Sequence, residues 1–390
     1  TGGWEEFWSA QWPDEDHPVS DGDLTSALDV DYEGKQEITA NYIMADIPLC
    51  PFVSLIGGLR HEMTEMSIIN VPEANARWVP LGTQNLPLLS DTPGAADVSF
   101  KQRDVLPSMG LVLKPMEHLT IRGAYTQTIA RPTFKELSPI MQQEYLGGPV
   151  FMGNPELQIS SLTNFDWRID YVPYAGGLFS FSWFLKKITN PIEYVQLTTN
   201  EFGFTRAVNY PKGRLTGYEF EIRQQMDRIW DGFKGLTLGG NMTLIDSDVW
   251  LPRSEIDVLE AVNIRVPITS RNMVNAPEHL YNIFLTYDWE PFGTKFGVFY
   301  TVKGDTLITG AGQEKGYFVP DVYAKQYETL NVSASQKIGK DFELTFKGKN
   351  LTNPLIQEVY RSRYLPGEDD VLKSSHSEGI DYSLGISGKW

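Results

Sequence analysis

Side chains that could hold a ligand are spread over segments rich in turn residues. Aromatic faces stack on sugars and other rings, and arginine pairs with carboxylates. The candidate substrate-binding residues are Trp78, Arg131, Phe134, Tyr145, Trp250, Arg361, Arg363 and Tyr364. The competing interpretation for each is packing between loops, and for Arg131 and Phe134 it is a rim turn where Pro132 ends a strand. We expect only some of the set to contact ligand.

Patterns for catalysis and metal binding are weak. There is no nucleophile–base pair, phosphate loop or HExxH motif, so an enzyme is the least supported class. The single cysteine, Cys50, and five scattered histidines indicate neither a disulfide framework nor a zinc site. Acidic residues near the start could bind a structural calcium ion, but they lack EF-hand spacing, and a solvated loop is favoured. These residues are Asp14, Glu15, Asp16, Asp21, Asp23, Asp29 and Asp31. Apart from that calcium, we expect no metal and no cofactor.

The composition narrows the class of protein. The chain has 390 residues, a net charge of −17 and 12% aromatic residues. The acidic balance argues against nucleic acid as a partner. No signal peptide opens the chain, and no apolar run is long enough for a membrane-spanning helix. A membrane β-barrel is still compatible with this composition, because its strands alternate polar and apolar residues and contain no long apolar run.

The elements that must position the candidate residues are strands, because apolar residues recur with a period of two. Phe179, Phe181 and Trp183, for example, alternate with Ser180 and Ser182. Such alternation predicts about thirteen antiparallel strands. Their expected ranges are 35–47, 52–67, 103–115, 118–130, 161–173, 177–196, 212–227, 235–249, 276–289, 294–309, 325–338, 341–353 and 378–390.

The connections between these strands alternate between short turns and long loops. The long loops are expected at 68–102, 131–160, 197–211, 250–275, 310–324 and 354–377. This asymmetry is typical of an all-β, transmembrane antiparallel β-barrel of an outer membrane, with long loops outside and short turns in the periplasm. Residues 1–34 then form the tail of an extracellular loop, and residues 35–390 form the C-terminal part of the barrel. By the same parity the C-terminus is periplasmic.

The predicted number of strands is odd, and the first strand has no earlier strand to pair with. The sheet therefore keeps an open edge, which is costly in lipid. We therefore expect further strands in an N-terminal portion that precedes this sequence.

Four segments resemble parts of TonB-dependent outer-membrane receptors. Residues 121–134, which end in Ala-Arg-Pro-Thr-Phe, are similar to the family's strand ending in "A-R-P-x-F". A second segment is Gly-Asn-Pro-Glu-Leu at residues 153–157, although Ile159, two residues later, stands where the family pattern usually has proline. A third is Lys-Asn-Leu-Thr-Asn at residues 349–353. Ile56-Gly57-Gly58-Leu59-Arg60 resembles the family's "G-G-x-R" hairpin.

The resemblance implies a 22-stranded barrel with a plugged lumen, of which these are the last strands. It also implies active uptake of a scarce, bulky nutrient such as a glycan, a siderophore or cobalamin. The implied partners are the plug and N-terminal strands of the same receptor, the inner-membrane TonB system, lipid and lipopolysaccharide, and a surface lipoprotein. The terminal residues Tyr382, Leu384, Ile386 and Trp390 resemble the signal read by the barrel-assembly machinery.

Two other functions are open at this point. A passive porin-type channel would share the alternating strands but would need neither plug nor TonB. A secreted carbohydrate-binding or adhesion protein would have to leave rows of large apolar side chains exposed to water, which soluble proteins rarely do.

Overall fold

The computed structural model describes residues 32–71, 77–78, 80, 87–143, 150–198, 203–314, 316–362, 364 and 370–388. The acidic stretch expected to be a solvated loop or a calcium site lies outside these residues, as do Tyr145, Arg363 and Trp390. No helix in the described part of the chain combines the length and the apolar character needed to cross a membrane.

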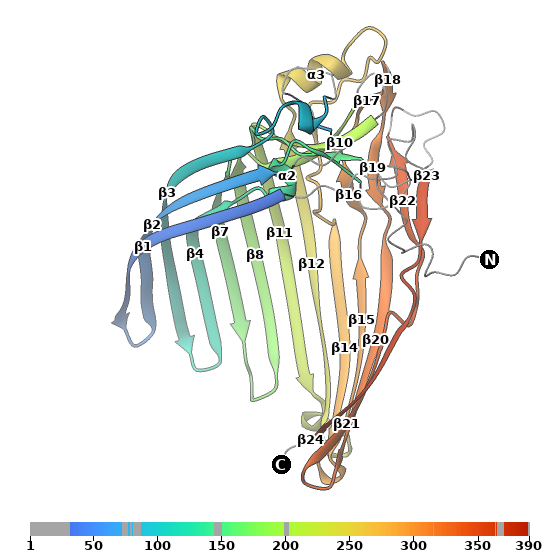
Figure 1. Ribbon diagram of the computed structural model, residues 1–390. Coiled ribbons are helices and arrows are strands. Elements are labelled where there is room, and N and C mark those ends of the chain that lie inside the picture. The colour runs from blue at the N-terminus through green and yellow to red at the C-terminus, as the bar shows by residue number, and fades with distance from the viewer. Residues whose placement is uncertain are drawn as a thin grey trace, which may run out of the picture.

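One large antiparallel sheet dominates the fold (Figure 1). It has 14 strands, and all but β13 (Ser270–Arg271), which pairs beside β12, follow one another in chain order. The path is β1 (Tyr32–Cys50), β2 (Val53–Asn70), β3 (Val98–Met116), β4 (Leu119–Ala130), β7 (Ser160–Tyr171), β8 (Leu178–Thr189), β11 (Lys212–Gln225), β12 (Leu236–Trp250), β14 (His279–Trp289), β15 (Thr294–Lys303), β20 (Tyr327–Ile338), β21 (Phe342–Lys349) and β24 (Asp381–Gly388). The predicted thirteen-strand meander is therefore confirmed.

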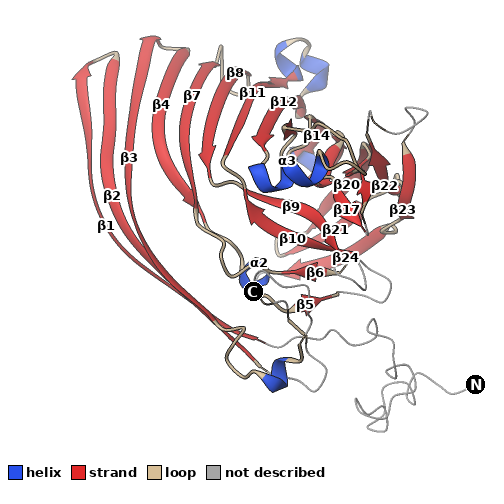
Figure 2. Cartoon of the chain, turned by 90° about the horizontal axis from the view of Figure 1, so that it is seen from above, coloured by secondary structure: helices blue, strands red, loops and turns tan. Residues whose placement is uncertain are grey.

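The sheet curves into an open trough whose two edges are β1 and β24 (Figure 2). At one end, which we call the turn end, the strands are joined by short connections. The longest of these contains η2 (Met226–Arg228) and η3 (Asp231–Phe233), and another contains η4 (Glu290–Phe292). Gly293, with φ 64°, and Gly339, with φ 66°, take the left-handed conformation that such tight turns require.

At the other end, the loop end, the long connections carry secondary structure that we call the cap. Figure 2, seen from above, shows β9 and β10 inside the arc of the large sheet. The cap comprises a sheet of β5 (Met141–Gln142), β6 (Phe151–Met152), β10 (Gly203–Asn209) and β9 (Ile192–Thr198), a sheet of β16 (Thr306–Thr309), β19 (Asp321–Ala324), β22 (Ile356–Arg361) and β23 (Val371–His376), the pair β17 (Gly312–Glu314) and β18 (Tyr317–Val319), the helices η1 (Leu89–Asp91), α2 (Phe134–Leu137) and α3 (Arg253–Leu259), and β13.

Three long strands predicted from alternation are wrong in extent, because the chain leaves the large sheet before the alternation stops. β8 ends at Thr189, where Asn190 takes φ 54° and Pro191 cannot donate to the ladder, and β9 then starts a different sheet. The stretch 294–309 divides in the same way into β15 and β16. β21 ends at Lys349, because Asn350 and Asn353 both take a positive φ.

The cap packs against the inner, concave face of the trough. Met66 and Ile68 of β2 and Val98 of β3 form one buried apolar cluster with Leu137 and Ala207 of the cap. By strand register, Ser180 and Ser182 lie on this concave face and are buried, whereas Phe179 and Phe181 are exposed on the convex face. The sheet thus turns an apolar surface outward and a polar one inward, as expected for a membrane barrel.

Candidate functional site

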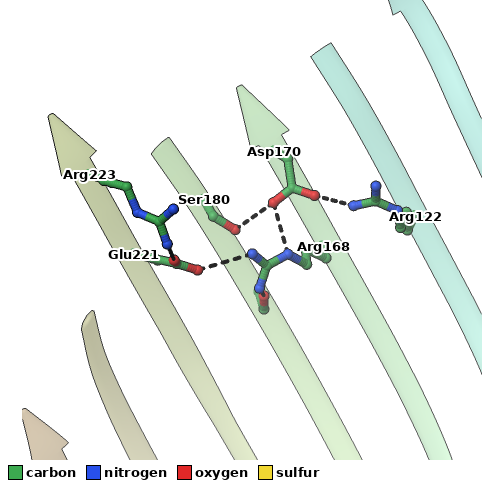
Figure 3. A network of polar contacts seen from close by, with 7 residues as sticks. Arg122, Arg168, Asp170, Ser180, Glu221 and Arg223 are labelled. Carbon is green, nitrogen blue, oxygen red and sulfur yellow. Dashed lines mark hydrogen bonds and ion pairs between the residues drawn. The ribbon is translucent and has the colours of Figure 1, made fainter. Parts of the chain in front are cut away.

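A polar network spans four neighbouring strands on the concave face, near the turn end (Figure 3). Its centre is Asp170 of β7, whose Oδ1 accepts hydrogen bonds from Arg168 Nε at 2.8 Å and from Ser180 Oγ at 2.8 Å. Arg122 of β4 forms an ion pair with the other carboxylate oxygen of Asp170. Cross-strand register explains the convergence, because Arg122 lies opposite Arg168, and Asp170 lies opposite Ser180.

The same network continues to β11. Arg168 Nη2 donates to Glu221 Oε2 at 3.2 Å, and Arg223 lies 3.7 Å from the other oxygen of Glu221. The guanidinium groups of Arg122 and Arg223 are half-exposed toward the interior of the trough. The face can therefore offer charged hydrogen-bond donors to whatever fills that interior.

A second cluster lies in the cap, where Arg271 of β13 is fully buried. Its Nη1 lies 3.2 Å from Glu255 Oε1 of α3 and 3.9 Å from Asp321 Oδ1 of β19. Tyr210, which follows β10, accepts a hydrogen bond from Arg271 and donates its own to Glu255 Oε2 at 2.5 Å. Glu193 of β9 lies beside them and accepts a hydrogen bond from the Val274 amide at 3.0 Å. The cluster therefore joins three separate excursions of the chain out of the large sheet. These are the connections between β8 and β11, between β12 and β14, and between β15 and β20.

Carboxylates outnumber the guanidinium in this cluster, and burial disfavours their charged forms. Burial raises the pKa of Glu193 to about 7. Burial, together with the charge of Asp321, raises the pKa of Glu255 to about 8. Burial also raises the pKa of Asp321, although Arg271 opposes that shift. The cluster thus holds protons near neutral pH rather than a surplus of negative charge.

A groove of about 620 Å³ opens beside the Arg271 cluster, a volume within the range of ligand sites. Tyr210 and Glu255 form part of its wall, and Val195, Leu197 and Val258 supply apolar surface. Six further lining residues carry side-chain amides: Asn154, Gln158, Asn190, Gln196, Asn209 and Gln313. Some of them bond to one another; Asn190 Nδ2 donates to Gln158 Oε1 at 2.9 Å, for example. The groove is therefore shaped for a neutral, hydrogen-bonding ligand more than for an anion.

A third cluster surrounds Arg361 of β22. Its Nε and Nη2 donate to the two oxygens of Asp370 at 2.7 and 2.8 Å, and its Nη1 lies 2.8 Å from Asp305. The hydrogen bond from Arg361 lowers the pKa of Asp370 to about 2. The guanidinium also lies 4.7 Å from the centre of the Tyr323 ring. This predicted ligand residue thus holds the cap together.

Other predicted binding residues also make structural contacts. Arg131 forms an ion pair with Glu62 and donates to Thr64 Oγ1 at 3.0 Å. Phe134 packs against Tyr32 with ring centres 6.5 Å apart.

The remaining predicted residues within the described ranges lie apart from one another. Trp78 donates to Thr92 Oγ1 at 3.1 Å and packs on a small core of the cap. Lys212 lies 4.3 Å from the centre of the Trp250 ring. Tyr364 donates its amide to Ser362 Oγ at 3.1 Å. Their role in substrate binding stays a prediction, and the structure brings no two of these three together.

Residues of the predicted assembly signal lie in β24. Tyr382, Leu384 and Ile386 alternate along the strand and are exposed. The ring of Tyr382 stacks on Phe346 of β21, with centres 6.1 Å apart. Their recognition by assembly machinery stays a prediction.

The Arg271 cluster has no signal in the sequence. Glu193, Glu255, Arg271 and Asp321 are far apart in the chain and follow no shared motif. Within the described ranges, no group of three or more His, Cys, Asp and Glu side chains is arranged to hold a metal ion.

The sequence matches the family described as "TonB dependent receptor-like, beta-barrel" over residues 2–351. No curated protein sequence matches the chain.

Several solved structures share its fold. The FrpB iron transporter from Neisseria meningitidis superimposes with a TM-score of 0.54 at 15% identity, covering 92% of this chain and 45% of that one. The siderophore receptor PiuA from Acinetobacter baumannii gives 0.56 at 14% identity, with coverage of 92% and 44%. The copper transporter OprC gives 0.60 at 12% identity, with coverage of 91% and 48%. The chain spans about half the length of these structures.

Proposed function

Because the chain belongs to the TonB-dependent receptor β-barrel family, we propose that it is the barrel portion of an active transporter in the bacterial outer membrane. The observation that carries the proposal is the combination of a thirteen-strand trough, apolar outside and polar inside, with a family match over most of its length. The nutrient would be scarce and bulky, such as a glycan, a siderophore or cobalamin. Among the similar structures, one is named an iron transporter, one a siderophore receptor and one a copper transporter.

In this proposal the cap is extracellular, and the turn end and the C-terminus face the periplasm. The polar network around Asp170 would contact a plug domain supplied by the same receptor, which the TonB system would move. Barrel-assembly machinery, lipopolysaccharide and a surface lipoprotein would be the remaining partners. The amide-lined groove favours the glycan among the three nutrients, because it presents neutral hydrogen-bonding groups beside apolar surface.

Uptake by the full-length receptor in cells tests the proposal. Labelled cobalamin, a ferric siderophore and a mixture of neutral oligosaccharides serve as probes, with and without a working TonB system. We expect one probe to accumulate only when TonB is present. Accumulation that is indifferent to TonB, together with a large steady current in planar bilayers, would instead establish the passive porin. Cap elements lying inside the arc of the sheet speak against such an open pore (Figure 2).

A further inference from the structure

An apolar groove of about 690 Å³ crosses the convex face of the sheet, close to the turn end. It runs over β7, β8, β11, β12 and β14, and its wall is almost entirely apolar. The side chains that line it on this face are Ile169, Tyr171, Phe179, Phe181, Phe220, Ile222, Met242, Tyr281 and Ile283. The convex face is the one that a membrane barrel presents to lipid.

One position along the groove has no side chain. Gly240 of β12 pairs in register with Ile222 on one side and Ile283 on the other. A row of large residues across the three strands is thus interrupted at its centre. The flanking Ile222 and Ile283 are 48% and 55% exposed, so the hollow lies open to the outside.

A cationic group lies where the groove approaches the turn end. Two residues beyond Ile222 on β11, the side chain of Gln224 accepts a hydrogen bond from the Tyr174 hydroxyl. The guanidinium of Arg228, in η2, lies 5.4 Å from the centre of the Tyr174 ring. Within the described ranges Arg228 forms no ion pair, although Asp227 lies next to it in the turn. Its charge is therefore available to an anion from outside.

The same turn carries an aromatic anchor for the membrane interface. Trp230 is 60% exposed and packs edge-on against Phe233 at 4.8 Å between ring centres. Tryptophan is enriched at this depth, where an apolar ring and a polar tip meet lipid headgroups. The turn that holds Arg228 is thus expected to lie at headgroup level.

We propose that this convex groove and Arg228 bind one anionic phospholipid, with an acyl chain in the groove and the phosphate at Arg228. The occupant follows from the membrane-facing position, the apolar wall, and the unpaired cation at headgroup depth. In the membrane the acyl chain leaves other lipid tails and not water, so its gain is dispersion contact with the groove wall. The guanidinium suits the phosphate in geometry and charge. This proposal rests on the membrane barrel and not on active transport. Lipid binding can therefore fail while the transport proposal stands, and transport can fail while lipid binding stands.

Native mass spectrometry of the full-length receptor, purified in detergent and titrated with phosphatidylglycerol or phosphatidylethanolamine, tests the site. We expect one phosphatidylglycerol molecule to stay bound, and phosphatidylethanolamine to bind more weakly. Arg228→Gln should weaken binding of phosphatidylglycerol about tenfold, since a hydrogen bond to a charged group is lost, and Arg228→Lys should retain most of it. The matched control is Lys340→Gln, in a different turn at the same end of the sheet.

A second pair of variants tests the groove itself. Met242→Trp should fill the hollow and reduce binding of phosphatidylglycerol, whereas Leu344→Trp, on the same convex face but outside the groove, should not. Heat-dependent gel migration verifies that each variant forms a folded barrel. Equal binding by all variants, or retention of many lipids without saturation, would overturn the proposal. So would selective retention of lipopolysaccharide in place of phospholipid.

Discussion

Two arginines hold the cap together in opposite ways. The side chain of Arg271 is 4% exposed and faces three carboxylates, whereas that of Arg361 is 32% exposed and shares two, Asp305 and Asp370. Arg271 connects three excursions of the chain. Arg361 connects β22 to Asp305, just before β16, and to Asp370, just before β23.

The difference shows how burial changes the same chemistry. Around Arg361, bidentate hydrogen bonds favour the ionised form of Asp370, and the pKa of this carboxyl falls to about 2. Around Arg271, burial dominates, and the pKa values of Glu193 and Glu255 rise to about 7 and about 8. Arg361 thus anchors an ionised carboxylate, Asp370, whereas Arg271 lies in a cluster that keeps some of its protons.

Loss of Arg271 should have the largest effect. Arg271→Met removes the cation from a buried cluster and leaves its hydrogen-bonding partners unmatched, which costs about 3–5 kcal/mol of stability. We expect hydrogen exchange in residues 253–275 and 306–324 to accelerate, while the large sheet remains protected. The matched control is Arg253→Met, whose partner Asp257 is exposed. Equal acceleration in the control would show that burial is not what distinguishes the two sites.

Raising the pH should loosen the Arg271 cluster selectively. Glu193 and Glu255 have raised pKa values in the folded protein, so their contribution is complete below about 4.5 and is lost as the pH rises through 7 and 8. Between pH 6 and pH 9 the loss for the two groups together should be about 4 kcal/mol. Exchange in α3 and β13 at matched intrinsic rates measures it, and Glu193→Gln should flatten the dependence.

The Arg361 cluster should respond in the opposite direction. The pKa of Asp370 is lowered, so its contribution is present above about 3.8 and is lost as the pH falls through about 2. Protection of β22 and β23 should therefore hold from pH 6 to pH 9. If β22 and β23 lost hydrogen-exchange protection between pH 6 and pH 9 together with the Arg271 cluster, the two clusters would not differ in the way their pKa values indicate.

A smaller test crowds Arg271 without removing it. A Cβ atom at Gly310 would lie 1.8 Å from the Arg271 guanidinium carbon. Gly310→Ala should therefore displace the guanidinium and cost about 1–3 kcal/mol, as other overpacked positions do. Thermal melting of the cap, followed by limited proteolysis, measures it. Gly339→Ala is not a suitable control because of its positive φ, whereas Gly110→Ala has room for the methyl group, with its nearest atom at 3.7 Å.

Loss of Arg361 should have the smallest effect. The pair with Asp370 is partly solvated, and exposed ion pairs contribute about 0–1 kcal/mol. Arg361→Met should accelerate hydrogen exchange in β23. This acceleration should be several-fold smaller than the one that Arg271→Met causes in α3. Salt should weaken the Arg361 cluster in the parent protein and leave the Arg271 cluster nearly unchanged. A larger cost for Arg361 than for Arg271 would reverse the comparison.

Much of the large sheet could be predicted from the sequence, because its signals are local. Alternation in residues such as 178–189 follows from the two-residue repeat of a strand, and Gly293 marks a turn by its own conformational freedom. The same logic fails at Asn190 and Pro191, where alternation continues from β8 into β9 but the chain changes sheets. A period of two reports that a segment is a strand and not which strand is its neighbour.

The sequence by itself thus determined the strand pattern, the two faces of the sheet and the resemblance to a receptor family. Only the tertiary structure decided which charges meet. Glu193, Glu255, Arg271 and Asp321 come from separate excursions, and their pairing depends on how these excursions pack inside the trough. The raised pKa values of the three carboxyl groups follow from burial, which is a property of the packed cap and not of any residue or spacing.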